Sequence, residues 1–355
     1  MRMLLRPEFL NGPFGDPALY IRELNSAAAM LVDCGDLSRL GTTRLLKVSR
    51  IFLSHCHIDH FFGFDLFLRA QMAVDRTTTI YGPPETSERV GGKLRGYTWN
   101  LIGDRNIELV VVDLDPKASR KRTTRFHSRS RFLPAEASEE AWDPRQPVFD
   151  AGTYQVSTAE LYHRTPSLAY VIEEKLTVGV NAGVLRELGL RPAAWINALK
   201  RLFLFGGIES AMLDVTLEAG GSRSYPAAEL ARRLLIPRQR HKIAYATDGA
   251  ASAGNRGKLV DLIRGADLFF CETCFLEEDR ALADETKHFT AAFVGSVARE
   301  AGVKKLAPFH FSKRYLGRAD EVIAEVSRGF GDEVVRLVPA GMKDGEEIWE
   351  EKESA

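Results

Sequence analysis

The sequence lacks several features that would each mark a class of protein. Its four cysteines in 355 residues are too few for a disulfide framework. No apolar run approaches the roughly 18 residues that a membrane span needs, and no apolar stretch near the start precedes a cleavage site. Neither sign of charge dominates, because Lys+Arg and Asp+Glu each total 48. These absences predict a cytoplasmic protein with reduced thiols, no membrane partner, and only local attraction to nucleic acid.

Composition and length predict an ordinary folded protein. Hydrophobic residues make up 45% and charged residues 27% of the chain, which argues against disorder and fibrous folds. A chain of this length fits about two domains, or one large layered domain with insertions. Residues 183–207 have the pattern of one or two short helices within an insertion.

Apolar segments that end in polar residues recur along the chain. We expect strands at residues 48–55, 154–163, 167–175, 242–248, 266–273 and 304–311. Helical spacing of apolar residues appears between some of them, at 61–73 and 290–301. This alternation predicts an α/β fold whose functional site is assembled along one edge of its sheets.

Histidines concentrate in the motif HCHIDH at residues 55–60, which holds three of the eight in the chain. At the end of a strand, His55 and His57 are two residues apart and project to the same side. The chain then turns, so that Asp59 and His60 can face a neighbouring position. One imidazole pair and one Asp–His pair can thus serve two adjacent metal ions, and these donors suit zinc, manganese or iron.

Further ligands are available at the ends of predicted strands. His163 follows AELY, Asp248 follows KIAYAT, and His310 follows KKLAPF. Taken alone, each is explained equally well as a capping aspartate or a buried core histidine. Together with the HCHIDH motif they give five histidines and two aspartates, enough for two metal ions that share one carboxylate.

Several segments resemble one enzyme family in order along the chain. HCHIDH resembles the H-x-H-x-D-H motif of the metallo-β-lactamase superfamily. HRTPSLAYVIEEK, IAYATD, CETCFLEE, KHFTAA and HFSKRY resemble segments of ribonuclease Z, the tRNA 3′-processing endonuclease. The resemblance implies an αββα sandwich of two mixed sheets between helices. We therefore expect a single domain over residues 1–355, with a helical insertion at about 183–240, and a homodimer.

The resemblance also implies a role for each matching residue. His55, His57 and His163 would hold a first metal ion, and Asp59, His60 and His310 a second, with Asp248 bridging the two. His288, in KHFTAA, would lie near the scissile phosphate, and Glu272, in CETCF, would orient it. In the family the insertion carries a Gly-Pro-rich arm that grips the tRNA elbow, whereas this chain has Ala193 and Ala194 in place of the Gly-Pro pair.

A mechanism follows from the chemistry of such a site. Two adjacent divalent ions, most simply Zn²⁺, would lower the pKa of a bridging water to give a hydroxide and would neutralise charge on the phosphate. Asp59 can accept the water's proton. The leaving 3′-oxygen needs a proton, which His288 can donate as imidazolium, and a nearby carboxylate such as Glu272 would favour that charged form.

Two other segments carry weaker signals. Residues 117–131 contain seven Lys/Arg and no acid, and we expect a solvated loop there, with a phosphate-contacting patch as the alternative. Cys271 and Cys274 form a C-x-x-C without the second pair that a structural zinc site needs. We expect these two to be small buried residues at the end of a strand.

Three functions remain open from the sequence. The first is a zinc-dependent phosphodiesterase that acts on RNA near a tRNA 3′ end. The second is a hydrolase of the same fold that acts on a small phosphodiester, lactone or thioester. The third is a non-catalytic RNA-binding or regulatory protein, which the complete ligand set disfavours.

Overall fold

The computed structural model describes residues 4–24, 26–175, 178–237 and 240–340 of the chain. These residues form two compact units. Among the described residues, the larger unit comprises Leu4–Asp150, Gln155–Glu173 and residues 242–340, and the smaller one consists mainly of residues between Glu174 and His241. Among the described helices, none combines the length and the apolarity that crossing a membrane requires.

The first sheet of the larger unit has eight strands in sequence order, from β1 to β8. Its centre is parallel, from β3 to β6, and its two sides are antiparallel. The strands are β1 (Leu5–Phe9), β2 (Leu19–Glu23), β3 (Ala29–Val32), β4 (Val48–Phe52), β5 (Thr77–Gly82), β6 (Glu108–Asp115), β7 (Arg120–His127) and β8 (Ser138–Ala141).

The second sheet has seven strands in the order β19-β18-β17-β16-β11-β10-β9. Strands β16 to β19 are parallel, whereas β11 pairs with β16 antiparallel. The strands are β9 (Phe149–Asp150), β10 (Tyr154–His163), β11 (Thr165–Glu174), β16 (Lys242–Ala246), β17 (Leu268–Glu272), β18 (Lys305–Phe309) and β19 (Glu333–Val334).

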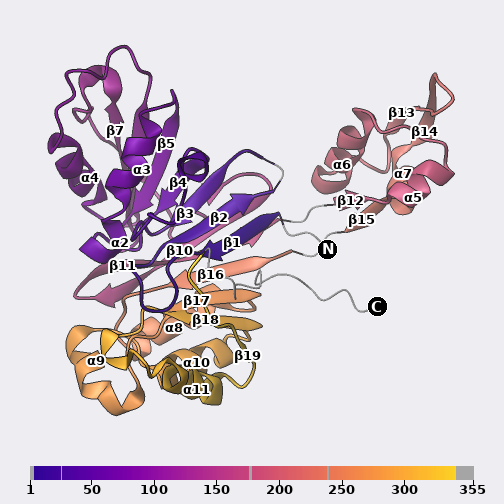
Figure 1. The fold of residues 1–355 in the computed structure, drawn as a ribbon. Coiled ribbons are helices and arrows are strands. Elements are labelled where there is room, and N and C mark those ends of the chain that lie inside the picture. The colour runs from indigo at the N-terminus through magenta and orange to yellow at the C-terminus, as the bar shows by residue number, and fades with distance from the viewer. Residues whose placement is uncertain (1–3, 25, 176–177, 238–239, 341–355) are drawn as a thin grey trace. The chain divides into compact units, whose positions relative to one another are not determined.

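Helices cover the outer face of each sheet (Figure 1). The first sheet carries α1 (Thr42–Leu45), α2 (Ile58–Phe61), α3 (Phe64–Gln71) and α4 (Thr86–Arg95), and the second carries α8 (Ala253–Ile263), α9 (Arg280–Thr286), α10 (Ala291–Glu300) and α11 (Ala319–Phe330). Strand alternation separates the two faces. In β16, for example, Ala244 and Ala246 pack in the core under the helices, while the intervening Tyr245 donates a hydrogen bond to Asp33 after β3.

Aromatic side chains join the two sheets face to face. Phe9 of β1 lies 4.7 Å from Phe309 of β18 between ring centroids, and Phe52 of β4 lies 5.5 Å from Tyr170 of β11. The Tyr170 hydroxyl also donates to the carbonyl of Leu53 across the interface. This arrangement confirms the predicted αββα sandwich.

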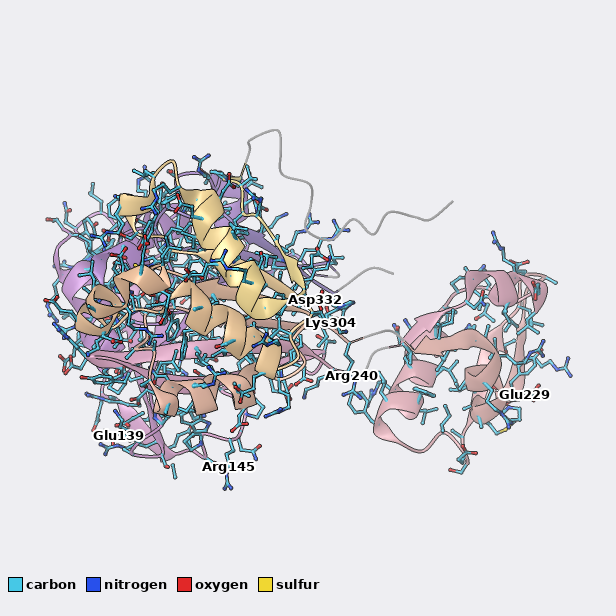
Figure 2. The ribbon with its side chains drawn as sticks, turned by 90° about the horizontal axis from the view of Figure 1, so that it is seen from below. Glu139, Arg145, Glu229, Arg240, Lys304 and Asp332 are labelled. Carbon is cyan, nitrogen blue, oxygen red and sulfur yellow. The ribbon has the colours of Figure 1, made fainter. Side chains whose placement is uncertain are left out.

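Most of the basic segment 117–131 is a strand, β7 (Arg120–His127), rather than the loop that the sequence suggested. Strand β7 pairs with β6 on one side and β8 on the other, and the acids of those strands neutralise part of its charge. Lys121 lies 2.9 Å from Glu140, and Arg125 lies 2.9 Å from Glu108. Glu139 on β8 and Arg145 beyond it project from the surface of the larger unit (Figure 2). The sequence pattern missed the strand because its acidic partners lie outside the segment.

The smaller unit has its own hydrophobic core, which includes Trp195, Leu199 and Leu230. Its helices are α5 (Ala182–Glu187), α6 (Trp195–Phe205) and α7 (Ala227–Leu234). It also contains two antiparallel pairs that were not expected: β12 (Val178–Val180) with β15 (Leu235–Pro237), and β13 (Met212–Thr216) with β14 (Ser222–Pro226). The division of the chain into one domain with an insertion at 183–240 stays a prediction.

Candidate metal centre

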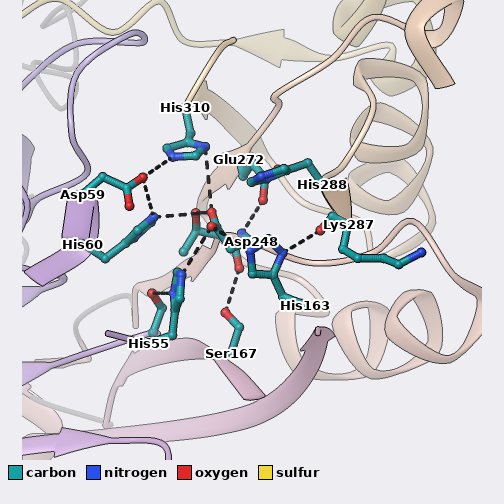
Figure 3. Close-up of polar contacts among 12 residues, drawn as sticks. His55, Asp59, His60, His163, Ser167, Asp248, Glu272, Lys287, His288 and His310 are labelled. Carbon is teal, nitrogen blue, oxygen red and sulfur yellow. Dashed lines mark hydrogen bonds and ion pairs between the residues drawn. The ribbon is translucent and has the colours of Figure 1, made fainter. Parts of the chain in front are cut away.

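All seven ligands expected from the sequence lie at strand ends or on one short helix. His55 and His57 follow β4, and Asp59 and His60 lie on α2, which begins directly after His57. His163 is the last residue of β10, Asp248 comes two residues after β16, and His310 follows β18 directly. The structure therefore brings together residues that are up to 255 positions apart, as Figure 3 shows.

The seven side chains divide into two groups of donor atoms. His55, His57, His163 and Asp248 form one group, and Asp59, His60 and His310 form the other. Within each group, one nitrogen or oxygen atom per residue lies within 4.8 Å of the others. This division is the one that the sequence suggested for two metal ions.

Asp248 connects the groups through its two carboxylate oxygens. Oδ2 lies 3.4 Å from Nε2 of His55 and 3.3 Å from Nε2 of His163. Oδ1 lies 3.5 Å from Nε2 of His60 and 3.8 Å from Nδ1 of His310. Each oxygen thus faces a different group, which is the geometry that a bridging carboxylate requires.

Outer hydrogen bonds fix how the histidines are turned. Nδ1 of His60 lies 2.9 Å from Oδ2 of Asp33, which is fully buried and also accepts hydrogen bonds from Ser54 and Tyr245. Nδ1 of His163 lies 2.8 Å from the carbonyl of Lys287. Such partners hold the ring so that its other nitrogen faces the centre. The sequence analysis did not anticipate this role of Asp33.

Unsatisfied nitrogens show what the centre can hold. Nε2 of His55, Nε2 of His60 and Nδ1 of His310 are buried and have no hydrogen-bond partner among the described residues. Buried polar atoms are normally paired, and leaving them unpaired costs free energy. Three inward-facing imidazole nitrogens beside two carboxylates form a donor set suited to cations. The residues therefore fit divalent metal ions.

The two groups differ in how their histidines hold protons. Burial, together with the neighbouring His55 and His163, lowers the pKa of His57 to about 4. Burial would also lower the pKa of His60, but the carboxylates of Asp248 and Asp33 outweigh it and raise the pKa well above its usual value. Since a metal ligand must be a neutral imidazole, His57 can bind an ion without losing a proton, whereas His60 must release one to do so.

Strained backbone conformations gather at this centre. Of the nine non-glycine residues with positive φ in the described chain, five belong to the centre or its surroundings: Asp33, Arg164, Asp248, Lys287 and His310. This left-handed conformation costs on the order of 1 kcal/mol for a residue with a side chain. Such strain concentrates where a side chain must be aimed for function.

His288 and Glu272 form a pair beside the two groups. Nδ1 of His288 lies 2.6 Å from Oε1 of Glu272, and Glu272 is fully buried at the end of β17. Burial would lower the pKa of His288, but the charge and the hydrogen bond of Glu272 raise it to about 9. The imidazolium form therefore predominates at neutral pH. The other oxygen of Glu272 accepts a hydrogen bond from the backbone N–H of Asp248, which ties the pair to the bridging aspartate.

A cleft of about 510 Å³ opens onto the centre. Its lining includes His57, Asp59 and His288, and also Arg164 and Thr165 at the turn between β10 and β11. Arg164 is exposed and donates a hydrogen bond to the carbonyl of Glu285. Arg164 thus places a positive charge on the wall of a cleft that also exposes candidate metal ligands.

Comparisons with known proteins agree with this geometry. The model of the metallo-β-lactamase superfamily matches residues 12–116. The chain is 29% identical over 318 residues to ribonuclease Z of Deinococcus radiodurans, covering 88% of this chain and 91% of that protein. It is 25% identical to ribonuclease Z of Methanosarcina acetivorans, covering 86% and 85%. The metallo-β-lactamase fold protein YhfI from Bacillus subtilis superposes with a TM-score of 0.54 at 16% identity, covering 94% of this chain and 96% of that one, which shows a shared fold.

Proposed function

We propose that the chain is a member of the metallo-β-lactamase superfamily and, within it, of the ribonuclease Z family, and that it is a metal-dependent endoribonuclease that processes tRNA 3′ ends. The observation that carries the proposal is the position of Asp248, whose two oxygens face two separate groups of donors. This arrangement supports a dinuclear centre, and dinuclear centres suit phosphodiester cleavage.

Two zinc ions are the cofactor that best fits the donors. His55, His57 and His163 with one oxygen of Asp248 would hold the first ion, and Asp59, His60 and His310 with the other oxygen would hold the second. Imidazole-rich sets favour zinc, although manganese and iron accept the same ligands. When bound, the pair supplies Lewis acidity toward a phosphate oxygen and lowers the pKa of a water molecule to near neutrality.

The chain's own residues carry the proton transfers and orient the substrate. Asp59, partly exposed to the cleft, is placed to accept a proton from the attacking water. His288, held as imidazolium by Glu272, is placed to donate a proton to the leaving 3′-oxygen. Arg164 is placed to contact a phosphate next to the scissile one, since arginine binds phosphate through several N–H donors.

An assay with two substrates tests this function. The purified protein, with its metal content measured, is offered a 3′-extended tRNA precursor and, separately, a small phosphodiester such as bis(p-nitrophenyl) phosphate. We expect the precursor to be cut near its 3′ end with the higher kcat/KM. If the metal-loaded protein leaves the precursor intact, the proposal that tRNA is its substrate is wrong. Efficient turnover of the small diester alone would instead favour a small-molecule hydrolase.

The smaller unit is expected to serve RNA binding rather than chemistry. Its helix α6 exposes Arg201, Phe203 and Phe205, and aromatic and cationic side chains together suit contact with nucleic acid. The unit can be removed cleanly, because Glu174 and His241 are hydrogen-bonded where β11 and β16 run antiparallel. A two-residue Asn-Gly turn in place of residues 175–240 would close this pair as a hairpin.

We expect this deletion to lower kcat/KM for the tRNA precursor by at least about tenfold, equivalent to about 1.4 kcal/mol. Metal content and turnover of the small phosphodiester should stay unchanged, since the ligands lie in the larger unit. Both substrates and the metal stoichiometry are measured on the same preparation. The single variant Phe205→Ala, which leaves the unit folded, should weaken precursor cleavage in the same direction. Equal losses on both substrates would argue against an RNA-binding role.

Two further expectations belong to the same proposal. The homodimer implied by the resemblance to ribonuclease Z is tested by sedimentation of the metal-loaded protein. A cytoplasmic location fits the four cysteines, all of which are free, since the cytoplasm keeps thiols reduced.

A further inference from the structure

A third group of potential metal ligands lies on the His288 side of the centre. Glu272, Cys274, His288 and His310 each offer one donor atom, and these atoms lie within 4.8 Å of one another. Only His310 is shared with the two groups proposed for the zinc pair. Cys274 has no part in the proposed mechanism, and its proximity to three other donors calls for a separate explanation.

Cys274 is a buried thiol in an acidic setting. It lies two residues beyond the end of β17 and is 6% exposed. Burial and the charges of Glu272, Asp248 and Asp59 raise its pKa above the usual value for a thiol, so that the free thiol stays protonated and unreactive. A cation among these donors reverses the effect, because a coordinated thiol loses its proton.

We propose that Glu272, Cys274, His288 and His310 form an additional, inhibitory site for a thiophilic divalent ion, Zn²⁺ or Cd²⁺. One thiolate, two imidazoles and one carboxylate make a four-donor set of the kind that zinc prefers. Binding releases the proton of the Cys274 thiol and the extra proton of His288 to solvent, and the ion takes their place. The metal site itself is independent of the proposed function, while its inhibitory effect rests on it.

The local contacts predict weaker binding here than at the zinc pair. An ion bound through Nδ1 of His288 would displace the hydrogen bond of 2.6 Å that joins this atom to Oε1 of Glu272. Glu272 also accepts hydrogen bonds from the backbone of Asp248 and Phe289, which competes with its use as a ligand. The additional site should therefore fill only when metal is in excess over the pair.

Occupation of this site would stop catalysis for two reasons. His288 would be a neutral ligand and could no longer donate a proton to the leaving oxygen. His310 would be drawn toward the additional ion and away from the second position of the zinc pair. Activity should consequently rise until the pair is filled and then fall as more zinc is added.

Cobalt titration of the chelator-treated protein detects the thiol ligand directly. A cobalt–thiolate bond gives a charge-transfer absorption in the near ultraviolet, which imidazole and carboxylate ligands do not give. In the unmodified protein, this absorption should appear only after two equivalents of Co²⁺ have bound. Cys274→Ser should abolish it and leave the visible d–d spectrum of the first two equivalents unchanged.

Cys56→Ser is the matched control. Cys56 lies between two proposed ligands, but its Sγ faces Thr86 Oγ1 at 4.0 Å, so this variant should keep the charge-transfer absorption. Persistence of the absorption in Cys274→Ser, or its absence from the unmodified protein with excess cobalt, would overturn the additional site.

An activity measurement separates this inference from the proposed function. With whichever phosphodiester the protein cleaves, excess Zn²⁺ should inhibit the unmodified protein, and Cys274→Ser should require at least about tenfold more zinc for the same inhibition. Cobalt–thiolate absorption without RNA cleavage would leave the site standing and remove the function. RNA cleavage without that absorption would remove the additional site and leave the proposed function standing. Equal inhibition of both proteins by zinc would likewise argue against the additional site.

Discussion

Asp248→Ala is expected to abolish binding of both metal ions and to reduce phosphodiester cleavage to background. The substitution removes one oxygen from each group of donors at once, because Oδ2 faces His55 and His163 while Oδ1 faces His60 and His310. It also removes the carboxylate that faces the buried nitrogens of His55, His60 and His310. Metal content measured by elemental analysis, together with the rate on a phosphodiester, checks the expectation.

The backbone at Asp248 calls for a second variant. Asp248 has φ of +51°, and alanine tolerates this conformation less well than aspartate or asparagine. Asp248→Asn keeps the shape and the backbone preference while removing the charge, and it should also lose both ions. Asp113→Ala serves as a control, because Asp113 is a buried carboxylate that accepts hydrogen bonds from Ser87 away from the centre. Retention of one full equivalent of metal in Asp248→Asn would contradict a bridging role.

His288→Ala should keep both metal ions and lower kcat by roughly 10²–10⁴-fold, the usual range for loss of an acid catalyst. The reason is that His288, held as a cation by the buried Glu272, lines the cleft without belonging to either group proposed for the metal pair. In the unmodified enzyme, activity should fall at alkaline pH as His288 loses its proton, because its charged form is the donor. In His288→Ala, the pH–rate profile should not show this fall in activity at alkaline pH.

A second histidine provides the control for this variant. His127 on β7 lies away from the cleft, with Nε2 2.9 Å from Oδ1 of Asn106, and His127→Ala should retain full activity. A substrate with a good leaving group, which needs little protonation, should lose less rate in His288→Ala than RNA does. Full activity of His288→Ala on RNA would leave His288 with a purely structural role.

The sequence could predict the main elements of this fold because its apolar segments end in polar residues at the points where the strands end. The run at residues 48–55 became β4, and the segments before Asp248 and His310 became β16 and β18. The spacing of apolar residues is a local property of the chain, so it can predict a strand but not the strands that pair with it in the sheet. For this reason β7 was taken for a loop, and the small strands β13 and β14 of the smaller unit were not anticipated.

The donor residues of the centre could be proposed from the sequence, but their surroundings could not. HCHIDH is dense enough to indicate metal binding by itself. The ends of predicted strands supplied His163, Asp248 and His310 as further candidates, and the resemblance assigned each of them to a metal ion. Asp33 carries no comparable signal, since an aspartate after a strand is common, and its contact with His60 exists only once β3 and α2 lie side by side. His163 is oriented by the backbone carbonyl of Lys287. Because every residue has such a carbonyl, the type of residue at position 287 could not have indicated this contact.

The wide spacing of the donors along the chain imposes an order on assembly during synthesis. The first set cannot close until Asp248 has left the ribosome, and His163 is not fixed until Lys287 follows it. The second set waits for His310, which follows Asp248 by 62 residues. A nascent chain can therefore capture its first ion well before its second. A chain truncated before β18 would contain all four residues of the first group but would lack His310 of the second.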